Sequence, residues 1–236
     1  IKELFRKTKV LELTDEVVEE LKKSTEGWIA GLKLISLIPT ESGRENELLM
    51  EFSKRANCAN EFLFDEVLIK QPNWIQEKLI SSSLFEPFNV ELLDAVFKQE
   101  GEGRNQAFVD WLLKSNMFII PLDYERKWFR YHHYFSELLH EQVTRHLTRE
   151  QERTLYSRAS QWFLEKGDFE AAIKYAVAGG EVETAVEIIE FNRRHELEYD
   201  HWYNLEKWLE LIPEAFRKKH PLFQLTYAWI YYKQTR

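Results

Sequence analysis

Two Glu-x-x-His pairs are the residues whose types and spacing first invite a metal hypothesis. Glu137 precedes His140 by three positions, and Glu198 precedes His201 in the same way. Di-iron helical bundles use this spacing twice. With 33 Glu and 7 His in 236 residues, however, about one such pair arises by chance, and the further glutamate ligands of a bundle cannot be assigned. We therefore expect no metal site, and a metal-dependent helical enzyme is the least favoured function.

The sequence offers neither a convincing catalytic nucleophile nor a phosphate-binding loop. Cys58 is the single cysteine, with no histidine within 70 residues, so we expect a small core residue. A lone cysteine also excludes an internal disulfide and a cysteine-based zinc site, and it fits a reducing compartment. The sequence contains no Gly-x-x-x-x-Gly-Lys-Ser/Thr, the loop that cradles nucleotide phosphates. We expect no catalysis by this chain alone.

Composition and net charge narrow the kinds of protein that this chain can be. The chain is 44% hydrophobic and 14% aromatic, which excludes disorder as the main state. Only 8 Gly and 6 Pro favour helices over an all-β sandwich. A net charge of −8 limits nucleic-acid binding to a local basic patch. No apolar run approaches the ~18 residues of a membrane span, so we expect no membrane contact. Because the chain begins at Ile1 rather than Met, we expect a piece of a longer protein.

The first segment predicts two helices. Thr14 can cap a helix that runs to Leu21, and Thr25 precedes an apolar helical pattern that begins at Trp28. Gly27 and Gly31 lie four residues apart near its start, where glycine costs up to ~1 kcal/mol against alanine. They indicate close approach of a ligand or of a neighbouring backbone, and tight helix packing explains them as well.

The middle of the chain predicts three helices followed by a hairpin. Pro72 suits the first position of one helix, Asn89 caps the next, and Phe108 belongs to a third. The period then changes, because Met117–Leu122 and Lys127–Tyr131 are short β-type runs around a polar turn. Three helices and a hairpin describe a winged-helix domain.

From Glu150 onward the pattern is helical throughout. Gly167-Asp-Phe-Glu-Ala-Ala-Ile matches Gly180-Glu-Val-Glu-Thr-Ala-Val at an offset of 13 residues. This spacing predicts two successive antiparallel helices, each with an acid at its N-terminus. The chain stops at Arg236 after an aromatic helix, so we expect a truncated array.

A wing beside basic residues raises the possibility of DNA binding, but the charge is weak. The segment from Lys127 to Arg158 holds six bases against four acids. The candidate recognition helix, Gln106–Lys114, carries Asp110 and Trp111 in a core pattern rather than a base-reading one. We expect no direct DNA contact by this chain.

Three stretches together resemble the large ATP-binding, LuxR-family transcriptional regulators of the MalT type, which are STAND ATPases. They are LELTDEVVEELKKSTEGWIAGLKLISL at 11–37, FLFDEVLIKQPNWIQEKLISSSLFEPFNVELLDAV at 62–96 and MFIIPLDYERKWFRYHHYFSELL at 117–139. In this family a nucleotide-binding domain precedes a helical lid, a winged helix, a superhelical sensor and a DNA-binding module.

The resemblance implies a mainly α fold, in which a winged-helix domain with one β-hairpin precedes a TPR-like antiparallel helical array. Residues 1–45 would be the C-terminal part of the lid of an ATPase module, 46–147 the winged helix, and 148–236 the start of the sensor array. It implies a cytoplasmic regulatory region that couples nucleotide state to an inducer-sensing array. Its partners would be an N-terminal ATPase domain, a C-terminal helix-turn-helix domain, a small-molecule or protein inducer, and further copies on activation. ADP or ATP would bind the full-length protein, with none tightly bound to this chain alone.

The resemblance also implies nucleotide-binding residues. Tyr131-His132-His133 matches a Met-His-Asp motif of related ATPases, which would place His132 on the ADP β-phosphate, although His133 replaces the Asp. Trp28 and Gly31 would line the base, although the proline of the related Gly-Leu-Pro turn is missing. The alternative for His132 is simple packing where the hairpin meets the next helix. The alternative for the whole chain is a helical-repeat adaptor that binds a protein or peptide.

Overall fold

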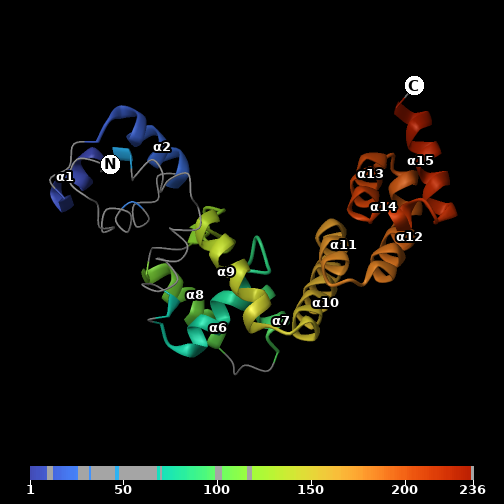
Figure 1. Cartoon of the computed structure of the whole chain (residues 1–236). Helices are drawn as coiled ribbons and strands as arrows, with labels where there is room; N and C mark the ends of the chain where they lie inside the picture. Colours follow the sequence, from blue (N-terminus) through green and yellow to red (C-terminus); the bar gives the residue numbers. More distant parts are fainter. Residues whose placement is uncertain are drawn as a thin grey trace. The chain divides into compact units, whose positions relative to one another are not determined.

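The computed structural model describes residues 1–9, 13–25, 32, 46–47, 68–69, 71–98, 103–115 and 119–234 (Figure 1). In chain order the elements are α1 (Lys2–Lys9), α2 (Asp15–Thr25), α6 (Asn73–Ser82), α7 (Val90–Val96), α8 (Arg104–Ser115), β1 (Ile119–Pro121), β2 (Phe129–Tyr131), α9 (His133–His146), α10 (Arg149–Lys166), α11 (Phe169–Ala178), α12 (Val182–Glu198), α13 (Trp202–Leu211), α14 (Glu214–Arg217) and α15 (Pro221–Gln234). The expected mainly α fold is confirmed.

The chain divides into two compact units. The first combines Ile1–Val90 with Gly101–His146, and the second combines Glu91–Glu100 with Leu147–Arg236. Most of α7 therefore belongs to the second unit, although its sequence lies among the winged-helix helices. Within the described ranges no helix has the length and apolar character needed to cross a bilayer.

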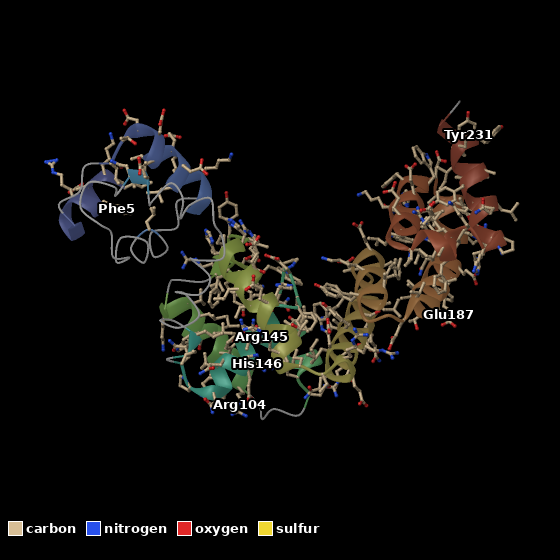
Figure 2. The ribbon with its side chains drawn as sticks, viewed as in Figure 1. Phe5, Arg104, Arg145, His146, Glu187 and Tyr231 are labelled. Atoms are coloured by element: carbon tan, nitrogen blue, oxygen red, sulfur yellow. The ribbon has the colours of Figure 1, made fainter. Side chains whose placement is uncertain are left out.

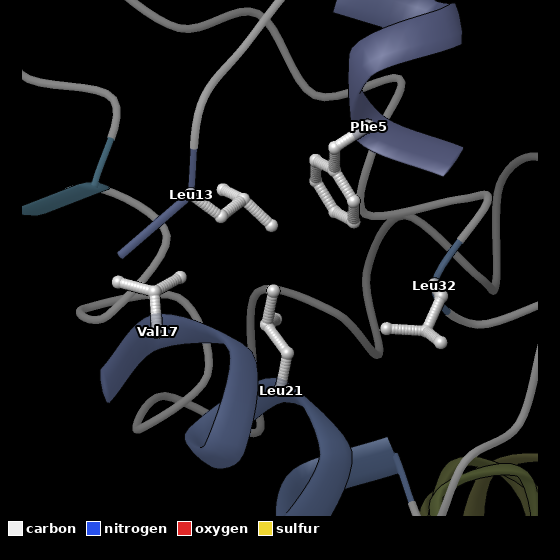
Figure 3. Close-up of a cluster of buried hydrophobic side chains, with 5 residues drawn as sticks. All are labelled: Phe5, Leu13, Val17, Leu21 and Leu32. Atoms are coloured by element: carbon white, nitrogen blue, oxygen red, sulfur yellow. The ribbon is translucent and has the colours of Figure 1, made fainter. Parts of the chain in front are cut away.

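Helices α1 and α2 bury a small apolar cluster (Figure 3). Its buried members, which are at most 6% exposed, are Phe5, Leu13, Val17, Leu21 and Leu32. Val17 and Leu21 are four residues apart and thus share one face of α2. The amphipathic pattern read from the sequence accounts for this face.

Thr14 caps α2, as predicted. The hydroxyl oxygen of Thr14 accepts from the backbone N–H of Val17 at 3.4 Å, and its carbonyl accepts from Val18 at 3.1 Å. The side chain thus satisfies one N–H group that the helix itself leaves without a partner. The helix predicted around Trp28 lies outside the described residues apart from Leu32, and Cys58, Gly27 and Gly31 lie outside them too.

The predicted hairpin is confirmed and gains a third member. Strands β1 and β2 pair antiparallel, with Ile119 opposite Tyr131 and Pro121 opposite Phe129. Phe88, between α6 and α7, exchanges two backbone hydrogen bonds of 2.9 Å with Phe129. Strand β2 is therefore bonded on both edges, and this bridge holds the hairpin against the segment that joins α6 to α7.

Helices α10 to α15 form the array, and their boundaries follow local rules. Thr148 and Gln151 make a reciprocal capping box at the start of α10. Asp168 caps α11 by accepting from Ala171 N–H at 3.0 Å. The 13-residue pattern does mark two successive helices. Glu181, the second expected N-terminal acid, makes no side-chain cap and instead accepts from Ser157 at 3.2 Å.

Three consecutive helices of the array end in the same way. Gly167, Gly180 and Asp200 follow α10, α11 and α12 with φ angles of 78°, 77° and 61°. After α10, Gly167 N–H bonds the carbonyl of Leu164 and Asp168 N–H that of Phe163. This is a Schellman ending, which requires a left-handed residue and favours glycine. The array continues to α15, where Tyr231 is 70% exposed (Figure 2).

Gly167→Ala should destabilise the array by ~1–2 kcal/mol, because a Cβ is strained in the left-handed region. Nothing lies within 4 Å of the added Cβ, so the cost is conformational rather than steric. Gly167→Asn is the matched control and should lose less, since asparagine tolerates this conformation. Urea unfolding midpoints measure the difference. Equal midpoints for glycine, alanine and asparagine would contradict the assignment.

Candidate functional site

The residue expected to touch phosphate lies where β2 passes into α9. His132 separates the end of the strand from the first helical residue, His133. Its carbonyl accepts from Ser136 N–H at 2.8 Å, which places His132 at the N-cap of α9. The side chain of His132 is only 3% exposed. The sequence thus places the imidazole at the junction, and the fold buries it there.

Tyr131, the residue before His132, is held by an aromatic cluster and by one hydroxyl pair. The ring of Tyr131 lies 5.0 Å from that of Phe88 and 5.9 Å from that of Phe135, measured between centroids. Its hydroxyl lies 2.6 Å from the hydroxyl of Ser82 on α6. Burial raises the pKa of Tyr131, because the charged phenolate would lose its hydration. The hairpin, α6 and α9 are therefore held at one point by a neutral buried tyrosine.

The junction combines residue types that could bind an anion, although His132 itself is buried. The first turn of α9 contains no acidic residue, and a helix N-terminus favours anions through its free N–H groups and its dipole. The rings of His132 and His133 lie 5.0 Å apart, so two imidazole donors flank this end. These residue types fit a phosphate. Because His132 is buried, contact would require its ring to turn out of the junction.

The other two predicted nucleotide-binding residues cannot be placed beside it. Trp28 and Gly31 both lie outside the described residues. The structure therefore positions His132 and leaves the assignment of Trp28 and Gly31 as predictions from the resemblance.

Three of the four residues in the Glu-x-x-His pairs contact other groups. Nδ1 of His140 lies 2.8 Å from the carbonyl oxygen of Ser136. Glu198 bonds Arg194 at 2.8 Å, which raises the pKa of that guanidinium. His201 lies 3.7 Å from a different carboxylate, that of Glu196. Among the residues that the structure describes, no group of three or more His, Cys, Asp or Glu side chains could hold a metal ion.

Two of the exposed polar side chains of α8, the candidate recognition helix, contact neighbouring side chains. Gln106 donates to Asp110 at 2.8 Å along the helix, so its amide is already engaged. The guanidinium of Arg104 lies over the ring of Trp74, 5.7 Å from its centroid (Arg104 is labelled in Figure 2). A recognition helix needs free side chains that reach base edges. The absence of DNA contact by this helix remains a prediction from the sequence.

Two contacts inside the second unit were not predicted from the sequence. Arg158 on α10 donates to the carbonyl oxygen of Val96, the last residue of α7, at 2.7 Å. Lys166, two turns further along α10, bonds Glu91 at the start of α7 at 2.9 Å. Helix α10 therefore holds α7 at both of its ends.

Comparison with known proteins supports the expected resemblance. The family model of the MalT winged helix domain matches residues 64–152. The HTH-type transcriptional regulator MalT of Vibrio campbellii is 26% identical over 227 residues, and that of Klebsiella pneumoniae is 26% identical over 216 residues. These matches cover 95% and 89% of this chain. The chain is therefore MalT-like over most of its length and carries a winged-helix domain.

A relative with a different name matches the same region. The serine/threonine-protein kinase PknK of Mycobacterium tuberculosis is 28% identical over 215 residues, which cover 90% of this chain. The matched region makes up 19% of the kinase and 25% and 23% of the two regulators. The chain thus spans about a fifth to a quarter of the length of the relatives it matches.

The two hydroxyl groups of the buried Tyr131–Ser82 pair should contribute unequally to the free energy of unfolding. Tyr131→Phe leaves Ser82 with a second acceptor, the carbonyl of Leu79 at 3.3 Å, and should cost about 1 kcal/mol. Ser82→Ala leaves the buried tyrosine hydroxyl without this partner and should cost more, up to ~3 kcal/mol. Urea unfolding of both variants and of the double variant tests this order. A larger loss for Tyr131→Phe would contradict it.

Tyr131 should also make the fold sensitive to alkali. Its pKa is raised in the folded state above the value of about 10 in the unfolded chain. Its contribution to the free energy of unfolding is therefore complete below about pH 10. It decreases as the pH rises above that value, because only the unfolded chain then releases the proton. Unfolding free energies measured between pH 8 and pH 11 should fall less steeply for Tyr131→Phe than for the wild type. Parallel pH profiles would contradict the burial of a neutral phenol.

Proposed function

We propose that this MalT-like chain is the regulatory middle region of a nucleotide-dependent, inducer-responsive transcriptional regulator. In this proposal the winged helix responds to the nucleotide held by an N-terminal ATPase domain. The helical array takes up an inducer, and a C-terminal helix-turn-helix domain binds DNA. This chain supplies the coupling between the two and no catalysis.

The observation that carries the proposal is that one region is common to proteins with different outputs. A kinase and HTH-type transcriptional regulators match nearly the whole chain at similar identity. A role shared by both relatives is neither phosphoryl transfer nor DNA reading. The engaged side chains of Gln106 and Arg104 on α8 support the second exclusion. A regulatory role remains.

His132 supplies the nucleotide link in this proposal. An imidazole N–H on the winged helix that bonds the β-phosphate of ADP would hold the ATPase domain in a resting state. The acid-free N-terminus of α9 favours the same anion. The burial of His132 implies that the nucleotide draws the ring outward, so the resting state would differ in the rotamer of this side chain.

The contacts between α10 and α7 suit the coupling step. Helix α7 is part of the winged-helix sequence, and Arg158 and Lys166 of the array hold its two ends. An inducer on the array shifts the switch only if it binds one arrangement of these helices more tightly than the other. ATP exchange and inducer binding would then release the resting state and permit self-association.

The alternative is a helical-repeat adaptor that binds a protein or peptide without a nucleotide. The aromatic side chains that α12 and the residue after it expose favour it, since Phe191 is 87% and Tyr199 64% exposed. Exposed aromatic residues are enriched at protein interfaces. The two proposals differ in the flanking sequence. The regulator requires a phosphate-binding loop before this region and a helix-turn-helix after it.

In the full-length protein, His132→Ala should weaken ADP binding by about tenfold or more and raise inducer-independent transcription. A hydrogen bond to a charged phosphate contributes ~1.5–3 kcal/mol, and 1.4 kcal/mol is a factor of ten. Calorimetric titration with ADP and a reporter gene without inducer are the two measurements.

Two further variants separate the phosphate role from packing. His132→Phe retains a ring in the buried site but cannot donate to phosphate, so it should lose ADP affinity as the alanine variant does. His140→Ala, on the helix that His132 precedes and with its Nδ1 against Ser136, should leave ADP affinity unchanged. Normal ADP affinity and basal activity in both His132 variants would reject the phosphate role and leave His132 as a packing residue.

A further inference from the structure

A polar cavity of about 770 Å³ lies along α10, wholly within the second unit. Three arginines line it, Arg149, Arg153 and Arg158, and Glu150 and Glu181 contribute carboxylates. Small-molecule sites typically measure ~300–1,000 Å³ and are mostly apolar. This cavity has the size of such a site, but every residue that lines it is polar or charged, so we expect a polar ligand.

Two of the arginines, Arg149 and Arg153, form no ion pair with a described residue. Arg149 and Arg153 are four residues apart and therefore lie on one face of α10. In the part of the chain that the structure describes, neither guanidinium has a carboxylate at ion-pair distance, whereas Arg194 on α12 is bonded to Glu198. Arg158 uses Nη1 to reach Val96, and its other N–H groups are not bonded to any residue that the structure describes. Three guanidinium groups around one cavity favour an anion with several oxygen atoms.

The remaining lining residues point to the organic part of the ligand. Thr154, Ser157 and Gln161 present neutral polar groups, and Ser157 donates to the carboxylate of Glu181 at 3.2 Å. Carboxylates accept hydrogen bonds from hydroxyl groups, and the organic part of a ligand can present such groups at a distance from its anionic group. The positive charge comes from side chains rather than from the helix end, because Thr148 already caps the N-terminus of α10.

We infer that this cavity binds a small hydroxylated phosphate ester. The guanidinium groups of Arg149 and Arg153 hold the phosphate through charge-assisted hydrogen bonds. Glu150 and Glu181 accept from the hydroxyl groups of the ester, and the neutral residues complete the lining. Nucleic acid is the less favoured source of phosphate, because the cavity carries only one net positive charge and the chain carries −8. The inference is independent of the proposed nucleotide switch.

Calorimetric titration of the chain with glycerol phosphate, inorganic phosphate and a short DNA duplex tests the assignment. Glycerol phosphate should bind saturably and more tightly than inorganic phosphate. The double variant Arg149→Gln/Arg153→Gln should weaken its binding at least tenfold, since each charge-assisted bond contributes about that factor. Both side chains are exposed, and circular dichroism should therefore show an unchanged helical spectrum.

A charge-matched control removes two positive charges elsewhere on the array. Arg194→Gln/Lys207→Gln should bind glycerol phosphate as the wild type does. An equal loss in this control would show general charge attraction and overturn the site. Absence of saturable binding in the wild type, binding of the duplex alone, or equal affinity for inorganic phosphate and the ester would overturn the assignment as well.

Discussion

The bond from Arg158 to the carbonyl of Val96 joins residues 62 positions apart and sets how the second unit begins. Val96 is the last residue of α7, so its carbonyl has no partner within the helix and lies at the negative end of the helix dipole. A guanidinium satisfies both the hydrogen bond and the charge. Lys166 also forms an exposed ion pair with Glu91 in the first turn of α7, so one long helix contacts α7 at both ends. The winged-helix sequence thus contributes an element to the array.

The first unit depends on a different kind of contact. Strand β2 has only three residues, too few to be stable on its own pairing. It is retained because Phe88 bonds its second edge and because Tyr131 reaches Ser82 across 49 residues of sequence. These contacts fix the point at which α9 starts. The side chain of His132 therefore occupies a defined buried place.

Local sequence patterns predicted the helices and the hairpin, whereas contacts between distant segments position the candidate sites. The Thr14 cap, the hairpin and the two Gly-acid repeats depend on neighbours within a few residues, and the structure contains them. The bridge at Phe88 and the Arg158 bond join distant segments, so no local pattern could indicate them. The Arg-x-x-x-Arg spacing of Arg149 and Arg153 was visible, but only the fold shows that it lines a cavity.

Because Arg158 both lines the cavity and bonds Val96, a ligand in the cavity would affect the contact between α10 and α7. Arginine has five N–H donors, and Arg158 uses Nη1 for the carbonyl of Val96. An anion that bonds the remaining donors need not displace that carbonyl. It would order the side chain in the conformation that already holds α7, and a ligand that prefers one state stabilises that state. A phosphate ester in this cavity would therefore strengthen the attachment of α7 to α10, and an inducer that releases α7 would have to act at another surface of the array.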